Sequence, residues 1–377
     1  MYFRGSARHL GKLFLRAVEI SYSIQLFNEV DALDAVNSTL AASNGTTKFP
    51  PNFRQFGGDM QSVAQTIQGM LVAAPRVYSF RGASKLLSMT DRIANPHASP
   101  VAIRVMAQGH RLKLDRRCQA EKWAYYTGRY DCEDLELLCR LLRPGDIVCD
   151  VGGNVGFYAV PIASRLQHFG GHLHTFEPVK ANFSRLQENI ALNGLQAYAT
   201  VHEYALSSRA GAAEITLRED FLAGSGTGNA AMAFSESDKS SFSVERIALR
   251  RLDDLGEEMH LDRLDLIKLD IEGHEDEFLR GGAGMITRHL PIIYMEVNKA
   301  YYRWRQVDLW DACRETVGTS HIAILPKWQR RAAWLVEKRL VGFQRVGGLS
   351  ACGEIDNIFL VPPQRMADLS AIAPISD

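Results

Sequence analysis

The stretch that decides the fold is Asp150-Val151-Gly152-Gly153-Asn154-Val155-Gly156-Phe157. An apolar run, residues 147–149, leads into it, and a helix-like pattern follows over residues 157–166. An acid that closes a strand, a glycine-rich turn and then a helix form a common nucleotide-holding unit of α/β proteins. The glycines let a ligand lie against bare main chain, and the helix start offers unpaired N–H groups. The stretch therefore predicts a site for a nucleoside-type ligand.

The bulk composition excludes several function classes. The 377 residues contain 43 lysines and arginines and 43 aspartates and glutamates, and this zero net charge argues against a dedicated nucleic-acid binder. The six cysteines show no C-x-x-C pair and no metal-ligand spacing, which favours a reduced, cytoplasmic protein. No apolar run approaches the roughly 20 residues that a transmembrane helix needs. A basic stretch with two tryptophans, residues 327–345, could hold RNA or an anionic lipid, but an amphipathic insert with solvated charges is favoured.

The chain divides into four parts on its sequence pattern. Residues 1–100 are expected to form a mainly helical extension of unknown role, through which the chain could form a homo-oligomer. Residues 101–145 are expected to form a hairpin and a helix that lead into the core. Residues 146–365 are the expected core domain, and residues 366–377 are the expected C-terminal tail.

Within the core domain, strands and helices alternate, as they do in a doubly wound parallel sheet. We expect strands at residues 147–151, 172–176, 200–205, 266–270, 292–297, 322–325 and 357–361, and helices at residues 157–166, 180–192, 275–286 and 307–317. Two extra strands, residues 215–217 and 244–249, interrupt this alternation. The polar, glycine-rich loop of residues 225–229 lies between them and is either a mobile lid or an ordinary hairpin loop.

Glu177 and Asp150 indicate which nucleoside ligand the turn would hold. Glu177 follows the second expected strand, where it could accept both hydroxyls of a ribose, although a solvated carboxylate is the plainer interpretation. The glycines lack the G-x-G-x-x-G spacing of a dinucleotide site, and Asp150 would repel a pyrophosphate. An acid at this position suits a ligand that carries an ammonium group and no phosphate, such as S-adenosylmethionine (SAM).

A second cluster of chemically useful residues ends the expected strand at residues 266–270. Lys268 and Asp270 share one face of that strand, and Glu272 and His274 follow in the exit turn. A lysine in a buried strand is expected to pair with a carboxylate. His274 has an ordinary pKa suited to proton transfer at neutral pH, although a structural ion-pair network would explain the same residues. Their spacing is weak evidence for a metal site, so we predict none.

Together these residues resemble the FkbM family of methyltransferases, over roughly residues 120–362. The resemblance is carried by several short motifs in the expected order: residues 150–156, 176–178, Asn189 with 192–195, 225–229, 251–255 and 268–275. It implies the fold class: a Rossmann-like, doubly wound α/β sheet of seven strands, the class I methyltransferase arrangement. The last strand, residues 357–361, would insert antiparallel between the fifth and sixth. Gly153 stands where these proteins more often have alanine, a difference that is not expected to disturb binding.

The resemblance also implies SAM as the cofactor and a hydroxyl acceptor on a sugar, a polyketide or another small metabolite. We expect Gly152, Gly153, Asn154 and Gly156 to contact the methionine part of SAM, Asp150 its ammonium group and Glu177 its ribose. Asp270 and Glu272 would border the sulfonium and the acceptor. His274 is the expected general base, with Asp270 as the alternative. Glu296, in the strand at residues 292–297, is either an acceptor-side carboxylate or the partner of a neighbouring arginine.

Two other function classes remain open on sequence alone. A nicotinamide-dependent oxidoreductase would share the fold and Glu177, although it conflicts with the glycine spacing and with Asp150. A non-catalytic module could keep the nucleoside pocket and use residues 1–100 to bind a partner. The intact cluster at residues 270–274 argues against that loss of activity.

Overall fold

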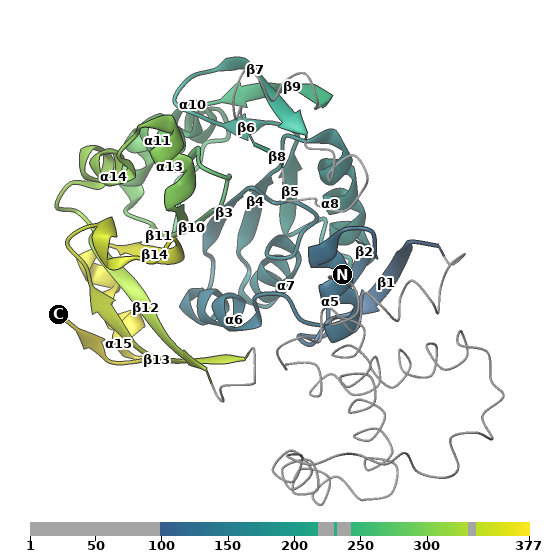
Figure 1. Cartoon of the computed structure of the whole chain (residues 1–377), viewed down its shortest axis with the longest axis horizontal. Coiled ribbons are helices and arrows are strands. Elements are labelled where there is room, and N and C mark those ends of the chain that lie inside the picture. The colour runs from purple at the N-terminus through teal and green to yellow at the C-terminus, as the bar shows by residue number, and fades with distance from the viewer. Residues whose placement is uncertain (1–98, 218–229, 232–242, 331–336) are drawn as a thin grey trace, which may run out of the picture. The chain divides into compact units, whose positions relative to one another are not determined.

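The computed structural model describes residues 99–217, 230–231, 243–330 and 337–377 (Figure 1). The chain divides into two units, and the described helices and strands lie in the second, Pro100–Asp377. The predictions of a helical extension over residues 1–100 and of an oligomer contact through it concern residues that, except for the last two, lie outside the described part. The proposed lid at residues 225–229 also lies outside the described part.

A mixed sheet forms the centre of this unit, with nine strands among the described residues. In sheet order the strands are β15 (Ile375–Ser376), β13 (Lys338–Arg345), β12 (Ile322–Arg330), β14 (Ile355–Val361), β11 (Ile292–Asn298), β10 (Leu266–Leu269), β3 (Ile147–Val151), β4 (His172–Phe176) and β5 (Ala199–His202). β14 runs antiparallel between β11 and β12, whereas β11, β10, β3, β4 and β5 are parallel neighbours. This order confirms the seven-stranded arrangement and the inserted last strand.

The sheet is wider than expected because the C-terminal residues extend one edge. β13 pairs with β12, and β15 pairs with β13. Residues 366–377, expected to be a tail, therefore contribute a helix, α15 (Met366–Ser370), and an edge strand. The basic stretch around residue 330 belongs to the β12–β13 hairpin on both sides of the undescribed residues 331–336.

Helices cover both faces of the sheet (Figure 1). One apolar core packs α6 (Cys132–Leu141), α7 (Ala159–Phe169) and α8 (Lys180–Leu192) against one face. A second core packs α10 (Leu252–Glu258), α11 (Glu275–Gly281), α12 (Ala283–His289) and α14 (Leu309–Val317) against the other. The single helix expected over residues 275–286 is wrong, because the backbone leaves helical geometry at Gly282 and separates α11 from α12.

The hairpin expected before the core is present and is tied to the glycine turn. It consists of β1 (Val101–Val105) and β2 (Arg111–Asp115), followed by α5 (Gln119–Thr127). The side chain of Asn189, on α8, accepts from the backbone N–H of Lys113 at 2.7 Å and donates to the carbonyl of Val155 at 2.8 Å. A buried ion pair between Glu121 and Arg185 joins α5 to α8. These contacts fix the turn from outside the sheet.

A small second sheet contains the two strands that interrupted the alternation. Its described strands are β6 (Ala205–Leu206), β7 (Gly211–Leu217), β8 (Ala230–Ala231) and β9 (Ser243–Arg250). The strand expected over residues 200–205 is thus divided between the two sheets, as β5 and β6. None of the described helices combines the length and the apolar character needed to cross a bilayer.

Candidate functional site

A cavity opens at the carboxyl ends of β3, β4 and β10. From β3 the chain adds β4 and β5 on one side of the sheet and then β10 and β11 on the other, so β3 lies at the topological switch point. Open α/β sheets bind ligands at this point. Seven of the nine predicted site residues line it, namely Gly152, Gly153, Asn154, Glu177, Asp270, Glu272 and His274. The other lining residues are Tyr130, Phe157, Tyr158, Pro178, Val179, Asn182, Ala205, Leu206, Ile215, Ile247, Lys268 and Ile271. Asp150 and Gly156 do not line the cavity.

The glycine turn passes close to the end of β10. The backbone N–H groups of Gly152 and Gly153 both donate to the carbonyl of Phe176, at 3.0 Å each. Gly152 has φ of 87°, and a Cβ atom there would lie 1.9 Å from the carbonyl oxygen of Asp270. Only glycine fits at this position, so bare main chain faces the cavity.

Gly153 is required for a different reason. A Cβ atom at this residue would lie 2.3 Å from the hydroxyl oxygen of Thr175 and 2.8 Å from a methyl carbon of Leu186. The Thr175 hydroxyl donates to the carboxylate of Asp150 at 2.9 Å. The glycine therefore leaves room for a hydroxyl that holds a buried acid in place.

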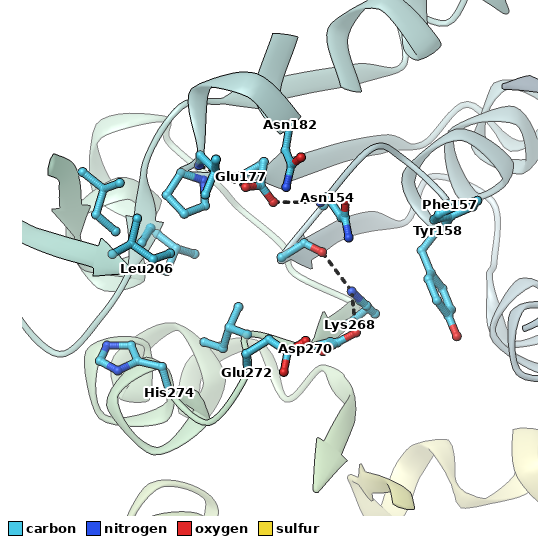
Figure 2. Close-up of a pocket in the computed structure, with 18 of the residues that line it drawn as sticks. Asn154, Phe157, Tyr158, Glu177, Asn182, Leu206, Lys268, Asp270, Glu272 and His274 are labelled. Atoms are coloured by element: carbon cyan, nitrogen blue, oxygen red, sulfur yellow. Dashed lines mark hydrogen bonds and ion pairs between the residues drawn. The ribbon is translucent and has the colours of Figure 1, made fainter. Parts of the chain in front are cut away.

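Asp150 lies behind the turn and not in the cavity. Its side chain is fully buried, and one carboxylate oxygen lies 3.4 Å from the Lys268 ammonium. The same ammonium donates to the carbonyl of Gly152 at 3.1 Å and lies 3.6 Å from Asp270 (Figure 2). The predicted pairing of Lys268 with a carboxylate is confirmed. The predicted direct contact between Asp150 and a ligand ammonium is not supported, because the Asp150 carboxylate is fully buried and paired with Lys268.

Lys268 remains a cation in spite of its burial. Burial lowers the pKa of its ammonium, but Asp150 and Asp270 outweigh that effect, and the pKa is raised overall. The ammonium also lies over the ring of Tyr158, 5.1 Å from the ring centre. Lys268 thus links β3, β10 and the turn through one buried charge.

Glu177 is a buried acceptor that points into the cavity. It is 5% exposed, and its two oxygens accept from the backbone N–H groups of Asn154 at 2.8 Å and Val179 at 3.0 Å. Burial raises the pKa of this carboxyl to about 7, against the opposing effect of those hydrogen bonds. Glu177 also accepts a side-chain hydrogen bond from Asn182. An ionised carboxylate accepts about four hydrogen bonds, so about one acceptor position is left for a ligand hydroxyl. The plainer interpretation, a solvated carboxylate, is wrong.

One end of the cavity is apolar. Ile215 of β7 and Ile247 of β9 join Val179 in a small apolar cluster, so the inserted sheet forms part of the cavity wall. His274 lies on this side, beside Leu206 in Figure 2, and its ring contacts the Ser207 hydroxyl at 3.0 Å. Burial first, and then the nearby positive charge of Arg305, lower the pKa of His274 to about 4. The histidine is therefore neutral at pH 7.

The opposite end combines aromatic rings and carboxylates. Tyr130 stacks on Phe157, with ring centres 3.8 Å apart and planes 6° from parallel. Asp270 lies at this end with its side chain 39% exposed, and Glu272 accepts a hydrogen bond from Tyr301. In Figure 2 Tyr158 and Lys268 lie on this side, away from His274. The predicted base and its alternative therefore border different ends of one cavity.

Glu296, on β11, interacts electrostatically with the carboxylates of this end. It does not line the cavity, and no arginine pairs with it in the part of the chain that the structure describes. Burial, Asp270 and Glu272, in that order, raise the pKa of its carboxyl to about 8. Among the arginines that the structure describes, none bears out the alternative of an arginine partner. Across the described ranges, no group of three or more histidine, cysteine, aspartate or glutamate side chains could hold a metal ion.

Several lining residues were missed by sequence reasoning. Ile215 and Ile247 belong to strands that were noticed but given no role, and their inward face could have been read from the apolar alternation. Val179 directly precedes α8, and its position after the Glu-Pro pair gives no sign that it lines a cavity. Tyr130 lies outside the core domain, so nothing in the sequence connects it with the turn.

Comparison with known proteins identifies the family of the domain that contains this site. Residues 150–332 match the family described as the methyltransferase FkbM domain. This domain belongs to the FkbM methyltransferase family. The match begins at Asp150 and includes every cavity residue except Tyr130.

Two curated proteins are similar to the FkbM domain. The 31-O-demethyl-FK506 methyltransferase FkbM of Streptomyces tacrolimicus is 29% identical over 161 residues, which is 37% of this chain and 60% of that protein. The hexuronic acid methyltransferase AglP of Haloferax volcanii is 28% identical over 175 residues, 46% of this chain and 65% of that protein. The chain thus spans somewhat under two thirds of the length of each relative.

Solved structures are similar at lower identity. The crystal structure of methyltransferase FkbM from Methylobacillus flagellatus shares 16% identity with a TM-score of 0.35, and the match covers 58% of this chain and 44% of that chain. The SAM-dependent O-methyltransferase of Thermotoga maritima shares 11% identity with a TM-score of 0.34, over 62% of this chain and 66% of that chain.

Proposed function

We propose that the protein is a SAM-dependent O-methyltransferase that methylates a hydroxyl group of a small acceptor. The observation that carries the proposal is the buried carboxylate of Glu177, which lies between an apolar slot and a bare glycine turn in an FkbM domain. Both curated relatives are named as methyltransferases, one of a hexuronic acid and one of a demethylated FK506.

The residues of the cavity fit SAM part by part. Glu177 keeps an acceptor position for a ribose hydroxyl beside its bond from Asn182, and the slot formed by Val179, Ile215 and Ile247 suits a flat base. Among the described residues, the buried side-chain oxygen of Asn154 has no hydrogen-bond partner, and a ligand ammonium would supply one. We therefore assign to Asn154 the ammonium contact that the sequence suggested for Asp150.

The chemistry of the reaction defines what the chain must do. Bound SAM supplies a methyl group on a sulfonium, which is already activated for in-line transfer to an oxygen. The protein then has to hold the acceptor hydroxyl in line with that methyl group and take its proton. Asp270 and Glu272 border the end of the cavity where the glycine turn and Lys268 meet, and this is the end we assign to the acceptor.

We assign the role of general base to Asp270, the alternative named from the sequence. Its carboxylate is partly exposed to the cavity and is held by Lys268, whereas His274 is engaged with Ser207 at the apolar end. The Tyr130–Phe157 stack beside Asp270 offers an apolar, planar surface for the acceptor. His274 then lies beside the adenine of the donor and not beside the acceptor.

The nicotinamide-dependent oxidoreductase has less support. A dinucleotide brings two phosphates, and three carboxylates, those of Glu177, Asp270 and Glu272, line the cavity. Among the described lining residues the one lysine or arginine is Lys268, which is already paired with two acids. The alternative of a non-catalytic module rests on residues 1–100, most of which lie outside the described part.

The proposal is tested by acceptor-dependent product formation. The full-length protein is incubated with SAM carrying a labelled methyl group and with a panel of neutral, cationic and anionic sugars and hydroxylated polyketides. We expect one acceptor class to gain a methyl group together with stoichiometric S-adenosylhomocysteine (SAH), and Asp270→Asn to abolish both. Fluorescence enhancement of NADH on mixing with the protein, without binding of SAM, would instead support the oxidoreductase.

A further inference from the structure

At the apolar end of the cavity, His274 is the lining side chain with polar atoms in the part of the chain that the structure describes. The walls of this end are formed by Val179, Ala205, Leu206, Ile215 and Ile247. His274 lies beside Leu206, whereas Asn182 lies beside Glu177 and is hydrogen-bonded to it (Figure 2). Ligand pockets of this kind fix the orientation of an apolar group with few polar groups. His274 is therefore the side chain that can contact the polar edge of a bound base.

The imidazole ring of His274 is held from the inserted sheet. Its Nε2 atom lies 3.0 Å from the hydroxyl oxygen of Ser207, which directly follows β6. Ser207 is 2% exposed, and its backbone N–H donates to the carbonyl of Arg250 on β9 at 2.9 Å. A Cβ atom at Gly281 of α11 would lie 1.9 Å from the carbonyl oxygen of Ser207, so the helix and this residue are closely packed. The hydroxyl therefore has a fixed position from which it orients the ring.

The other ring nitrogen, Nδ1, is available to a ligand. Within the described ranges it makes no hydrogen bond, and it is not one of the buried polar atoms that lack a partner. Nδ1 is therefore reachable by solvent, on a residue that lines the cavity. Because burial and Arg305 lower the pKa of His274 to about 4, the ring is neutral at pH 7. When the Ser207 hydroxyl donates to Nε2, Nδ1 carries the proton, and when the hydroxyl accepts, Nδ1 is a bare acceptor.

The edge of adenine that lies away from the ribose suits either form of this ring. In the proposed complex Glu177 holds the ribose and the base fills the slot formed by Val179, Ile215 and Ile247, so that N1 and N6 lie at the far edge of the base. N1 of adenine accepts a hydrogen bond, and its N6 amino group donates one. In hypoxanthine the pattern is reversed, because N1 carries a proton and O6 accepts. Either form of His274 therefore matches adenine and mismatches hypoxanthine.

We propose that His274 is a specificity-determining residue that recognises the N1–N6 edge of the adenine of SAM through Nδ1, and that Ser207 is a positioning residue that sets the tautomer and orientation of its ring. The inference rests on the proposed function. The inserted sheet then contributes to donor recognition in two ways, through the apolar wall and through the position of Ser207. Because the contact is confined to the base, it acts equally on SAM and SAH.

A matched pair of ligands tests the proposal without an acceptor. S-inosylhomocysteine (SIH) differs from SAH in carrying hypoxanthine in place of adenine. Both ligands are titrated calorimetrically into the full-length protein at pH 7. Since they share the ribose and the amino-acid tail, Glu177 and the glycine turn contribute equally to both affinities. We expect SIH to bind about 10- to 100-fold more weakly than SAH, which is the cost of leaving a donor or an acceptor unpaired.

Three variants locate the source of the preference. His274→Phe keeps a ring without nitrogen atoms, and it should weaken SAH binding about tenfold and bring the two affinities within about threefold of each other. Ser207→Ala frees the imidazole and should lower the preference for SAH at least about threefold. A general loss of packing would weaken both ligands together and leave the ratio unchanged. Glu354→Gln, at an exposed acid paired with Arg303, should change neither affinity.

Each other outcome has a defined meaning. Equal binding of SAH and SIH by the unmodified protein, a comparison that needs no variant, would overturn the inference while leaving the proposed function intact. A preference for SAH that survives His274→Phe would overturn the role of His274. A ratio unchanged in Ser207→Ala would overturn the role of Ser207. Failure of both ligands to bind the folded, unmodified protein would overturn the proposed function and this inference with it.

Discussion

Replacing Gly153 by alanine tests how the glycine turn is built. The added Cβ atom would lie 2.3 Å from the Thr175 hydroxyl oxygen and 2.8 Å from a methyl carbon of Leu186. The left-handed φ that constrains Gly152 is not found at Gly153, so the effect of the substitution comes from packing. Since Thr175 is held by its hydrogen bond to Asp150, relief of the clash requires that bond to break.

The expected loss of stability is limited by two costs, because the structure can respond to the added Cβ atom in two ways. Overpacking of a filled core costs about 1–3 kcal/mol. A hydrogen bond to a charged group contributes about 1.5–3 kcal/mol. Because overpacking and the broken bond are alternative responses, the cheaper one sets the loss, and we expect Gly153→Ala to lower the free energy of unfolding by about 1–3 kcal/mol.

A double-mutant cycle in urea, followed by circular dichroism, separates the packing effect from others. Thr175→Ala removes the clashing hydroxyl, so Gly153→Ala should cost less in that background by about 1–2 kcal/mol. A change below about 0.5 kcal/mol for Gly153→Ala in the wild-type background would refute the reasoning. Equal costs in the two backgrounds would show that Thr175 is not the obstacle.

Three further predictions concern the charges of the site. Lys268→Met leaves Asp150 buried without its cation and should lower stability by about 3–5 kcal/mol in urea, whereas a loss below about 1 kcal/mol would contradict the pairing. SAH should bind about tenfold more weakly at pH 6 than at pH 8 by calorimetry, because Glu177, with its pKa of about 7, must be ionised to accept a ribose hydroxyl beside its existing bonds. Glu177→Gln should give weak binding with no pH dependence. His274→Gln should weaken SAH binding yet keep turnover at saturating SAM within about tenfold, while Asp270→Asn lowers turnover at least ~100-fold; the reverse pattern would return the base to His274.

The elements around the turn were predictable because local signals determine them. The strands at residues 147–151 and 172–176 agree with β3 and β4, since the first is apolar and leads into the glycine turn, and the second is followed at once by Glu177 and Pro178. The helix at residues 180–192 agrees with α8, which begins two residues after Pro178 and ends before Gly194. The position of β14 followed from the family resemblance and not from any local pattern.

The remaining features depend on contacts between distant segments. The sequence places Asp150 at a strand end, but only the pairing of β3 with β10 shows that Asp150 forms an ion pair with Lys268. The role of Ile215 and Ile247 in the cavity wall depends on how the inserted sheet folds back, which no single strand reveals. His274 had the right chemistry for a base, and its place at the apolar end could be seen only in three dimensions.

We infer that the cavity binds a nucleoside with a methionine tail through Glu177. The most direct test is calorimetry of the purified protein with SAM and with SAH, repeated on Glu177→Ala. We expect saturable one-to-one binding of both ligands and a large loss of affinity for both in Glu177→Ala. Absence of binding to either ligand, or binding that Glu177→Ala leaves unchanged, would contradict it.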